Sequence, residues 1–178
     1  MDKVLKAYFD KLRHEGKHPE ELKDFKGQLF PDLGKLEEWR NNRKGLRYFD
    51  DESGITLMGA VDDIFVNEKG QLVPLDFKTR GYPLKEDTHE HYQHQLDIYA
   101  YLLEKNGYKT ANFAILLFYH PLCVNSHCNV EFHADTVKMQ TNTGNAEKLF
   151  KEAVRTVKGD IPHKTEDCPF CDWNPSEH

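Results

Sequence analysis

The sequence has no long hydrophobic run, no internal repeat and no low-complexity segment. No apolar stretch approaches the roughly 20 residues of a membrane-spanning helix, and nothing at the N-terminus resembles a secretory signal, so we expect a cytoplasmic protein with no membrane partner. An excess of basic residues is also absent. The net charge is −6, which argues against a passive nucleic-acid binder because lysine and arginine make the phosphate contacts. With 38% hydrophobic and 30% charged residues among 178, the composition predicts a soluble globular domain and excludes a disordered chain.

Cysteine is scarce too, with four residues in two pairs. A chain of this length can build a core of its own, so we do not expect a disulfide framework. Cys123 and Cys128 lie in a predicted hairpin loop, and Cys168 and Cys171 lie near the C-terminus. Four thiolates could hold a tetrahedral Zn²⁺ if the C-terminal tail folded back on the loop, and four reduced thiols are the alternative. Three histidines surround the first pair: His120, His127 and His133.

A β-hairpin is predicted in the middle of the chain. Thr56–Val66 and Leu72–Thr79 are rich in β-branched and apolar residues, and Asn67–Gly70 between them is typical of a tight turn with a left-handed glycine. With a one-residue glycine bulge, Val66 lies opposite Leu72. This pairing fixes the register of the whole hairpin.

Two carboxylates and a lysine stand inside these strands. Counting back from the turn places Asp62 opposite Asp76 and Ala60 opposite Lys78, and side chains that alternate with a period of two then share one face. Asp63 points to the other face, where we expect a structural role. Apolar residues are predicted to fill that face: Val61, Phe65, Val73, Leu75 and Phe77.

Like charges directly opposite each other on a sheet are destabilising unless a cation lies between them. Carboxylate oxygens suit a hard divalent ion such as Mg²⁺, which keeps several waters and takes further ligands from substrate phosphate. The pattern therefore predicts a metal site for phosphodiester hydrolysis. The alternative is an exposed ion pair between Asp76 and Lys78, with Asp62 in a turn.

Three motifs in this order resemble those of a known family. They are Gly59-x-Val61-Asp62, then Pro74-Leu75-Asp76-Phe77-Lys78, then Gln95-Leu96-x-x-Tyr99. Together they resemble the motifs of RecB-type nucleases in the PD-(D/E)XK superfamily, which also includes the iron–sulfur exonucleases of CRISPR adaptation. The similarity extends, more weakly, from about Met1 to Trp173.

The resemblance implies an α/β restriction-endonuclease-like core, with a mixed central β-sheet flanked by helices. It also implies that Asp62 and Asp76 ligate Mg²⁺ or Mn²⁺ and that the backbone carbonyl of Phe77 adds a ligand. Lys78 would be the catalytic lysine. Gln95 and Tyr99, four residues apart on one helical face, would lie beside these groups.

The chain departs from the family pattern near its N-terminus. RecB-type enzymes take a further ligand from a helix before the first strand, and here Asp2–Glu15 offers Asp10 as the candidate. An ordinary solvated helix charge is the alternative. The predicted buried stripe of this helix is Val4, Leu5, Tyr8, Phe9 and Leu12.

The cysteines depart from the family pattern as well. Cys168 and Cys171 resemble the C-terminal pair of members that hold an iron–sulfur cluster, but those members need a further cysteine at each end. The chain starts as though an N-terminal segment were absent. We therefore expect no complete [4Fe–4S] cluster in this chain.

Candidate nucleic-acid contacts flank the predicted site. Thr79 and Arg80 directly follow Lys78 and are placed to touch phosphate. A basic segment also precedes the hairpin, and a solvated helix end is the alternative for it. Its basic residues are Arg40, Arg43, Lys44 and Arg47.

The organisation expected along the chain is a nuclease-like domain over 1–157 and an irregular tail over 158–178 that carries the Cys-x-x-Cys pair. Beyond the hairpin, the predicted helices are Asp2–Glu15, Lys35–Arg43, Asp87–Glu104 and Thr143–Val157, and the predicted strands are Ala111–Tyr119 and Asn129–His133. The first of these strands is expected to join the sheet after a helical crossover.

The sequence thus predicts a Mg²⁺- or Mn²⁺-dependent deoxyribonuclease that acts on DNA, alone or inside a larger repair or defence complex. The alternative is a non-catalytic module. Such a module would be either a degenerate nuclease fold or a zinc-stabilised domain that binds nucleic acid or protein.

Overall fold

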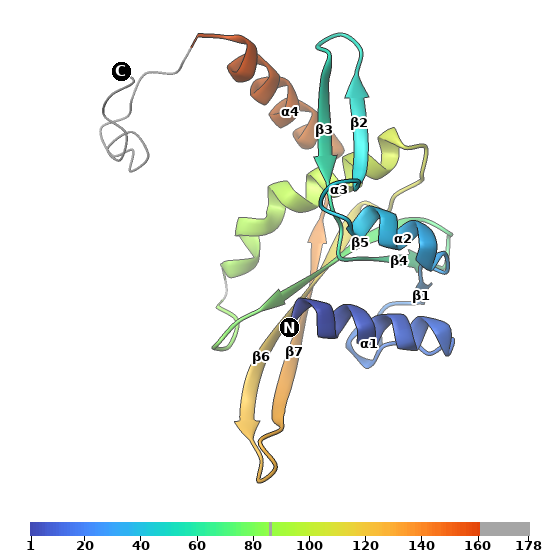
Figure 1. Cartoon of the computed structure of the whole chain (residues 1–178), viewed down its shortest axis with the longest axis vertical. Coiled ribbons are helices and arrows are strands. Elements are labelled where there is room, and N and C mark those ends of the chain that lie inside the picture. Colours follow the sequence, from blue (N-terminus) through green and yellow to red (C-terminus); the bar gives the residue numbers. More distant parts are fainter. Residues whose placement is uncertain (86, 161–178) are drawn as a thin grey trace, which may run out of the picture.

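A five-stranded mixed sheet forms the centre of the molecule (Figure 1). The structure, a computed structural model, describes residues 1–85 and 87–160. The strand order is β1-β4-β5-β6-β7, so β5 is central. The strands are β1 (Gly27–Leu29), β4 (Asp63–Asn67), β5 (Leu72–Thr79), β6 (Phe113–Val124) and β7 (Val130–Gln140).

Helices cover both faces of this sheet. On one face, α1 (Asp2–His14) and the 3₁₀ turn η1 (Glu20–Leu22) pack through Phe9 and Leu22 against Phe65, Leu75 and Leu117. On the other face lie α2, η2 and α3, whose side chains pack against Ile64, Leu116 and Phe118. These elements are α2 (Leu33–Arg40), η2 (Thr88–Tyr92) and α3 (Gln93–Lys105). Both faces of the sheet are buried, so the side chains of β5 are mostly apolar on both faces.

The last helix, α4 (Thr143–Lys158), packs on α3 away from the sheet (Figure 1). Buried Asp97 of α3 joins the two helices, since its carboxylate accepts hydrogen bonds from Asn142 N and Asn145 Nδ2, both at 2.8 Å. This helix matches the predicted Thr143–Val157. In the part of the chain that the structure describes, no helix is long and apolar enough to cross a membrane.

The predicted register of the central hairpin is confirmed. Val66 pairs with Leu72 and Asp63 with Leu75 in the antiparallel β4–β5 ladder. Gly70 closes the turn at φ +71°, a left-handed conformation that glycine adopts without a steric penalty. Asp62 directly precedes β4 and lies outside this ladder, so its predicted pairing with Asp76 is not part of the sheet; its carboxylate instead accepts a hydrogen bond from the backbone N–H of Phe77.

The prediction of one strand over Thr56–Val66 is wrong. Ile55–Gly59 forms β3, which pairs with β2 (Leu46–Asp50) in a separate two-stranded sheet, and the chain turns before β4 begins at Asp63. The predicted pair of Ala60 with Lys78 therefore lies outside the ladder. Val61 packs with Ile64 on the α3 face and not with Phe65, because the turn breaks the alternation of the strand.

The crossover prediction is confirmed: β5 and β6 are parallel, and η2 and α3 lie between them in sequence. The hairpin that follows is longer than predicted, since β6 runs to Val124 and β7 to Gln140, and it projects from the body (Figure 1). The length of β7 is hard to predict because polar and apolar residues alternate along it, so it contains no long apolar run. The predicted helix Asp87–Glu104 is divided into η2 and α3.

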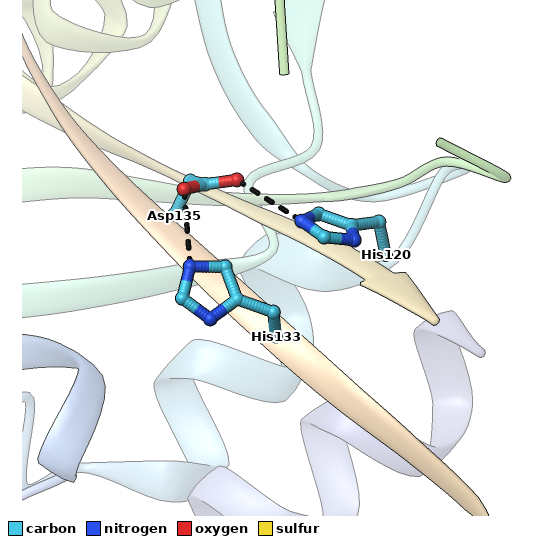
Figure 2. A group of neighbouring side chains, drawn as sticks. All are labelled: His120, His133 and Asp135. Atoms are coloured by element: carbon cyan, nitrogen blue, oxygen red, sulfur yellow. Dashed lines mark ion pairs between the residues drawn. The ribbon is translucent and has the colours of Figure 1, made fainter. Parts of the chain in front are cut away.

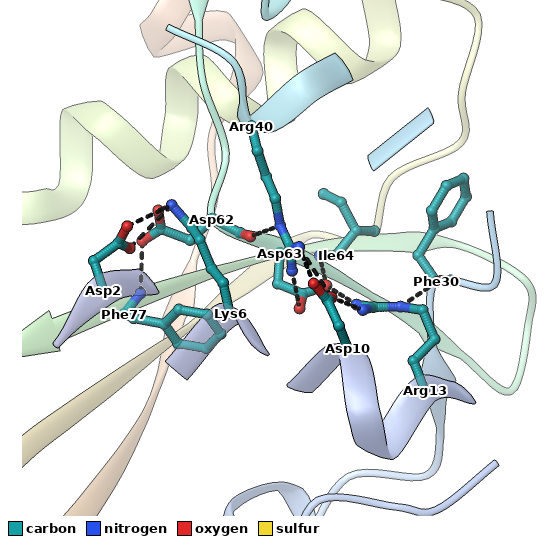
Figure 3. Close-up of polar contacts among 10 residues, drawn as sticks. All are labelled: Asp2, Lys6, Asp10, Arg13, Phe30, Arg40, Asp62, Asp63, Ile64 and Phe77. Atoms are coloured by element: carbon teal, nitrogen blue, oxygen red, sulfur yellow. Dashed lines mark hydrogen bonds and ion pairs between the residues drawn. The ribbon is translucent and has the colours of Figure 1, made fainter. Parts of the chain in front are cut away.

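The buried stripe of α1 is narrower than predicted. Leu5 and Phe9 are buried, whereas Val4 and Tyr8 are 64% and 41% exposed. The sheet therefore covers only one row of side chains along this helix, spaced four residues apart. Its neighbouring row carries Lys6 and Asp10, which face the ends of β4 and β5 (Figure 3).

Candidate active site

Strand β5 brings an acid and a lysine to the α3 face of the sheet. Asp76 is buried, with 1% of its surface exposed, and Lys78 lies two residues further on the same face. Lys78 Nζ forms an ion pair with Asp76 Oδ2 at 2.5 Å. The predicted pairing of these two groups on one face is therefore present.

Helix α3 adds an amide and a phenol to this pair. Gln95 Nε2 donates to Asp76 Oδ1 at 3.2 Å and to the Tyr99 hydroxyl at 2.7 Å, while Gln95 Oε1 accepts from Lys78 Nζ at 3.2 Å. One side chain thus holds the acid, the lysine and the phenol together. The Tyr92 ring lies 4.5 Å from Lys78 Nζ and adds a cation–π contact that the sequence did not predict.

Asp62 reaches the site from the turn before β4. Its Oδ2 accepts from the backbone N–H of Phe77 at 2.9 Å, and its Oδ1 lies 2.9 Å from Lys6 Nζ (Figure 3). Lys6 also pairs with Asp2 one turn earlier on α1. The first helix therefore presents a lysine to Asp62, a contact that the sequence analysis missed. The Phe77 carbonyl as a metal ligand stays a prediction.

The electrostatics of Asp76 are unusual. Burial, and then repulsion from the Asp62 carboxylate, raises the pKa of Asp76 to about 6. Lys78, whose ammonium group lies 2.5 Å from the buried Oδ2, acts in the opposite direction and lowers this pKa. Burial likewise raises the pKa of Tyr99 to about 12, so this hydroxyl stays protonated.

These residues fit a divalent cation. Two carboxylates that repel each other, one of them buried, form an all-oxygen set of the kind that Mg²⁺ or Mn²⁺ prefers. Lys6 and Lys78 supply the compensating positive charge in this structure.

A second charged cluster lies behind Asp62. Fully buried Asp63 pairs with Arg13 and, at 2.9 Å, with Arg40, and both arginines also pair with Asp10 (Figure 3). Arg40 Nε donates to the Asp62 carbonyl at 2.6 Å. The expected structural role of Asp63, pointing away from Lys78, agrees with this arrangement.

This cluster corrects the prediction that Arg40 contacts nucleic acid. The Arg40 side chain is 9% exposed and fully engaged with Asp10, Asp63 and the backbone of Asp62. Its role is to fix the loop that carries Asp62. Asp10, the candidate ligand from α1, is likewise held by two guanidinium groups.

The other candidate residues lie at the surface. Arg43, Lys44 and Arg47 are exposed where α2 leads into β2, and Thr79 is exposed at the end of β5. Arg80 is partly buried and lies 4.7 Å from the Tyr82 ring. Contact of these residues with nucleic acid stays a prediction.

The two cysteines within residues 1–85 and 87–160 do not lie at this site. Cys123 and Cys128 are exposed free thiols on the β6–β7 hairpin. Cys168 and Cys171 lie outside the described residues, so a four-thiolate zinc site stays a prediction.

A mixed sheet flanked by helices, with an Asp-x-Lys motif on its central strand, defines a nuclease-type architecture. The chain belongs to the PD-(D/E)XK nuclease superfamily, whose family model matches residues 1–176. The fold is the restriction-endonuclease-like fold expected from the sequence.

No curated protein matches the chain. A solved structure described as the crystal structure of SSO0001 is similar, with 19% sequence identity and a TM-score of 0.36. The similarity covers 59% of this chain and 43% of that one, so this chain spans less than half the length of that protein.

Proposed function

We propose that this protein is a Mg²⁺- or Mn²⁺-dependent DNA nuclease of the RecB type. The observation that carries the proposal is the buried carboxylate of Asp76, which pairs with Lys78 and is repelled by the nearby carboxylate of Asp62. A buried charge of this kind is costly for folding, so its presence favours a functional site. Superfamily membership supports the same reaction class.

Asp62 and Asp76 would hold the cation, with the Phe77 carbonyl as a further oxygen donor. When bound, the cation would polarise the phosphoryl oxygen and lower the pKa of a water. Two hydrogen bonds orient Asp62 for this role. The Phe77 N–H donates to its carboxylate, and Arg40 Nε donates to its backbone carbonyl. The protein's own hydrogen bonds thus hold the Asp62 carboxylate in position for a cation.

Lys78 would orient the attacking water or stabilise the negative charge that develops on phosphate. The Gln95 amide oxygen and the Tyr92 ring restrain its ammonium group. Tyr99, which stays a neutral phenol, lies on the next turn of α3 and accepts a hydrogen bond from Gln95. These contacts keep a flexible lysine in one orientation at the metal site.

The substrate backbone would approach over residues that follow Lys78 and over the exposed basic residues between α2 and the start of β2. Thr79 and Arg80 follow Lys78 directly, and Arg43, Lys44 and Arg47 provide further positive charge. Work within a larger repair or defence complex is part of the proposal, since it would supply additional DNA contacts to an acidic chain.

The test is incubation of the purified chain with linear duplex, circular duplex and single-stranded DNA, with Mn²⁺, with Mg²⁺ and with chelator. We expect cleavage that chelator abolishes. Lys78→Ala should remove cleavage while the circular dichroism spectrum stays unchanged, whereas Lys69→Ala, in the exposed turn at the other end of β5, should cleave normally. Equal cleavage by both variants would refute the mechanism.

A non-catalytic role is the alternative outcome. Absence of cleavage of every DNA form with either metal would favour a degenerate nuclease fold or a zinc-stabilised domain that binds nucleic acid or protein. Titration with Mn²⁺ would then show whether Asp62→Asn still changes metal binding.

A further inference from the structure

A second cluster of metal-binding side chains lies on the β6–β7 hairpin, outside the proposed active site. His120 of β6 and His133 and Asp135 of β7 converge (Figure 2). His120 and His133 are direct cross-strand partners, and Asp135 is two residues from His133 on the same face. The regular antiparallel register therefore places all three side chains together.

The spacing of these side chains suits one bound ion. His120 Nε2 lies 3.6 Å from Asp135 Oδ2, and His133 Nε2 lies 3.2 Å from Asp135 Oδ1. Two ligands of a tetrahedral Zn²⁺ with bonds of about 2.0–2.1 Å are roughly 3.3–3.4 Å apart. One donor atom from each residue lies within 4.8 Å of the others, so small side-chain rotations suffice to close the set.

The burial of the three residues is uneven. His120 is buried, with 6% of its surface exposed, and its Nδ1 has no hydrogen-bond partner. The other ring nitrogen, Nε2, faces Asp135 and is the atom that would bind a cation in this cluster. The side chains of His133 and Asp135 are 52% and 32% exposed, so the cluster is open to solvent on one side.

We propose that His120, His133 and Asp135 bind one Zn²⁺, with a fourth coordination position left open to solvent. Two imidazoles and one carboxylate are a donor set for zinc-class metals, whereas Mg²⁺ prefers oxygen ligands. Three protein ligands with an open position characterise a site that takes water or an anionic oxygen as the fourth ligand. The thiols of Cys123 and Cys128 are not needed for this site.

The register also fixes where this site lies. Lys78 of β5 pairs with Phe118 of β6, and His120 is two residues further along β6 on the same face. With about 3.3 Å per residue and about 4.8 Å between strands, the Cα atoms of Lys78 and His120 are roughly 8 Å apart. The zinc site thus extends the face that carries Asp76 and Lys78, but its existence does not depend on nuclease activity.

The decisive measurement is isothermal titration of the full chain with Zn²⁺. The starting protein carries serine in place of all four cysteines, which removes every thiolate ligand. We expect one equivalent of Zn²⁺ to bind. Since substitutions that only support metal ligands cost roughly 10–100-fold in affinity, His133→Ala, which removes an exposed ligand, should weaken binding by more than about 100-fold.

Asp76→Asn in the same background is the matched control. It removes an acid of the proposed Mg²⁺ site and should leave the zinc affinity unchanged. Asp135→Asn should behave like His133→Ala. Circular dichroism before titration confirms that each variant is folded.

Cobalt substitution gives an independent readout. Co²⁺ bound to the wild-type hairpin should show visible d–d bands without a thiolate-to-metal charge-transfer band, and His133→Ala should lose them. The proposal is overturned if the cysteine-free chain binds no Zn²⁺, or if His133→Ala binds it as tightly as its parent.

Discussion

The Asp76 side chain combines burial, a nearby like charge and a lysine partner. Because its pKa in the folded protein is about 6, above the roughly 3.9 of an unfolded chain, the folded state holds this proton more tightly. The contribution of Asp76 to stability is therefore fully present below pH ~4 and is lost as the pH rises through about 6.

Replacement of this acid should separate stability from activity. In chelator at pH 7, we expect Asp76→Asn to raise the free energy of unfolding by roughly 1–3 kcal/mol, because it removes a buried charge. Urea denaturation measures this difference, which should shrink towards zero near pH 4. The same variant should lose DNA cleavage. A destabilised variant at pH 7 would contradict the electrostatic account of the site.

Arg40 and Arg43 allow a matched test of the buried cluster. Arg40→Ala leaves Asp63 buried with one partner fewer and frees the Asp62 carbonyl, so we expect a loss of about 3–5 kcal/mol. Arg43 is exposed, and Arg43→Ala should change stability by less than about 0.5 kcal/mol. Urea denaturation of the two variants checks this. Equal effects would mean that the cluster is not structural.

Side-chain parity explains which site residues the sequence predicted. Asp76 and Lys78 could be placed on one face because strand alternation has a fixed period, and the turn set the register of β4 with β5 as far as Asp63. Lys6 and Tyr92 escaped prediction because their contacts depend on how α1 and η2 pack on the sheet. No local pattern carries that information.

Among the elements, α3 is the one that completes the site, and Gly59 determines how closely it approaches β3. A Cβ atom at Gly59 would lie 2.9 Å from Leu102 Cδ1 and 3.2 Å from the Tyr99 ring. Any larger residue would therefore push on the same helix that carries Gln95.

We expect Gly59→Ala to lower stability by about 1–3 kcal/mol through overpacking and to reduce cleavage severalfold. Gly81→Ala is the control, since a Cβ atom there meets nothing within 4 Å. Thermal unfolding and a DNA cleavage assay measure the two effects. Unchanged cleavage by Gly59→Ala would show that the position of α3 does not set the geometry of Lys78 and Gln95.

The elements differ in how well the sequence predicted them. α1, α4 and β5 follow from clear periodicity, and their bounds agree with prediction to within one or two residues. The division of Thr56–Val66 into β3 and β4 could not be predicted, because apolar residues continue through the turn between them. The two strands belong to different sheets. Long-range packing decides such a break.

At the scale of the whole molecule, the β6–β7 hairpin stands apart from the core. Its outer part is exposed, including the apolar residues Leu122, Val124, Val130 and Phe132. The core clusters include β6 residues only up to Tyr119. The tip therefore adds little to the stability of the body.

Replacement of residues 122–131 by Asn-Gly would join Pro121 to Phe132, which are cross-strand partners, through a two-residue turn. We expect the free energy of unfolding to change by less than about 1 kcal/mol, measured by urea denaturation. His120, His133 and Asp135 remain in this variant. A loss of several kcal/mol would show that the tip is part of the cooperative fold.

The parallel pairing of β5 with β6 has a consequence for how the protein is made. The residues of the proposed active site come from β5, the turn before β4 and the crossover helix α3, so a chain that has emerged only as far as β5 contains Asp62, Asp76 and Lys78 but not Gln95. Non-local pairing of this kind forms slowly. A nascent chain therefore contains both acids before the helix that contacts Asp76 has been synthesised. We expect the proposed active site to form only after α3 and the second half of the sheet have packed against β5.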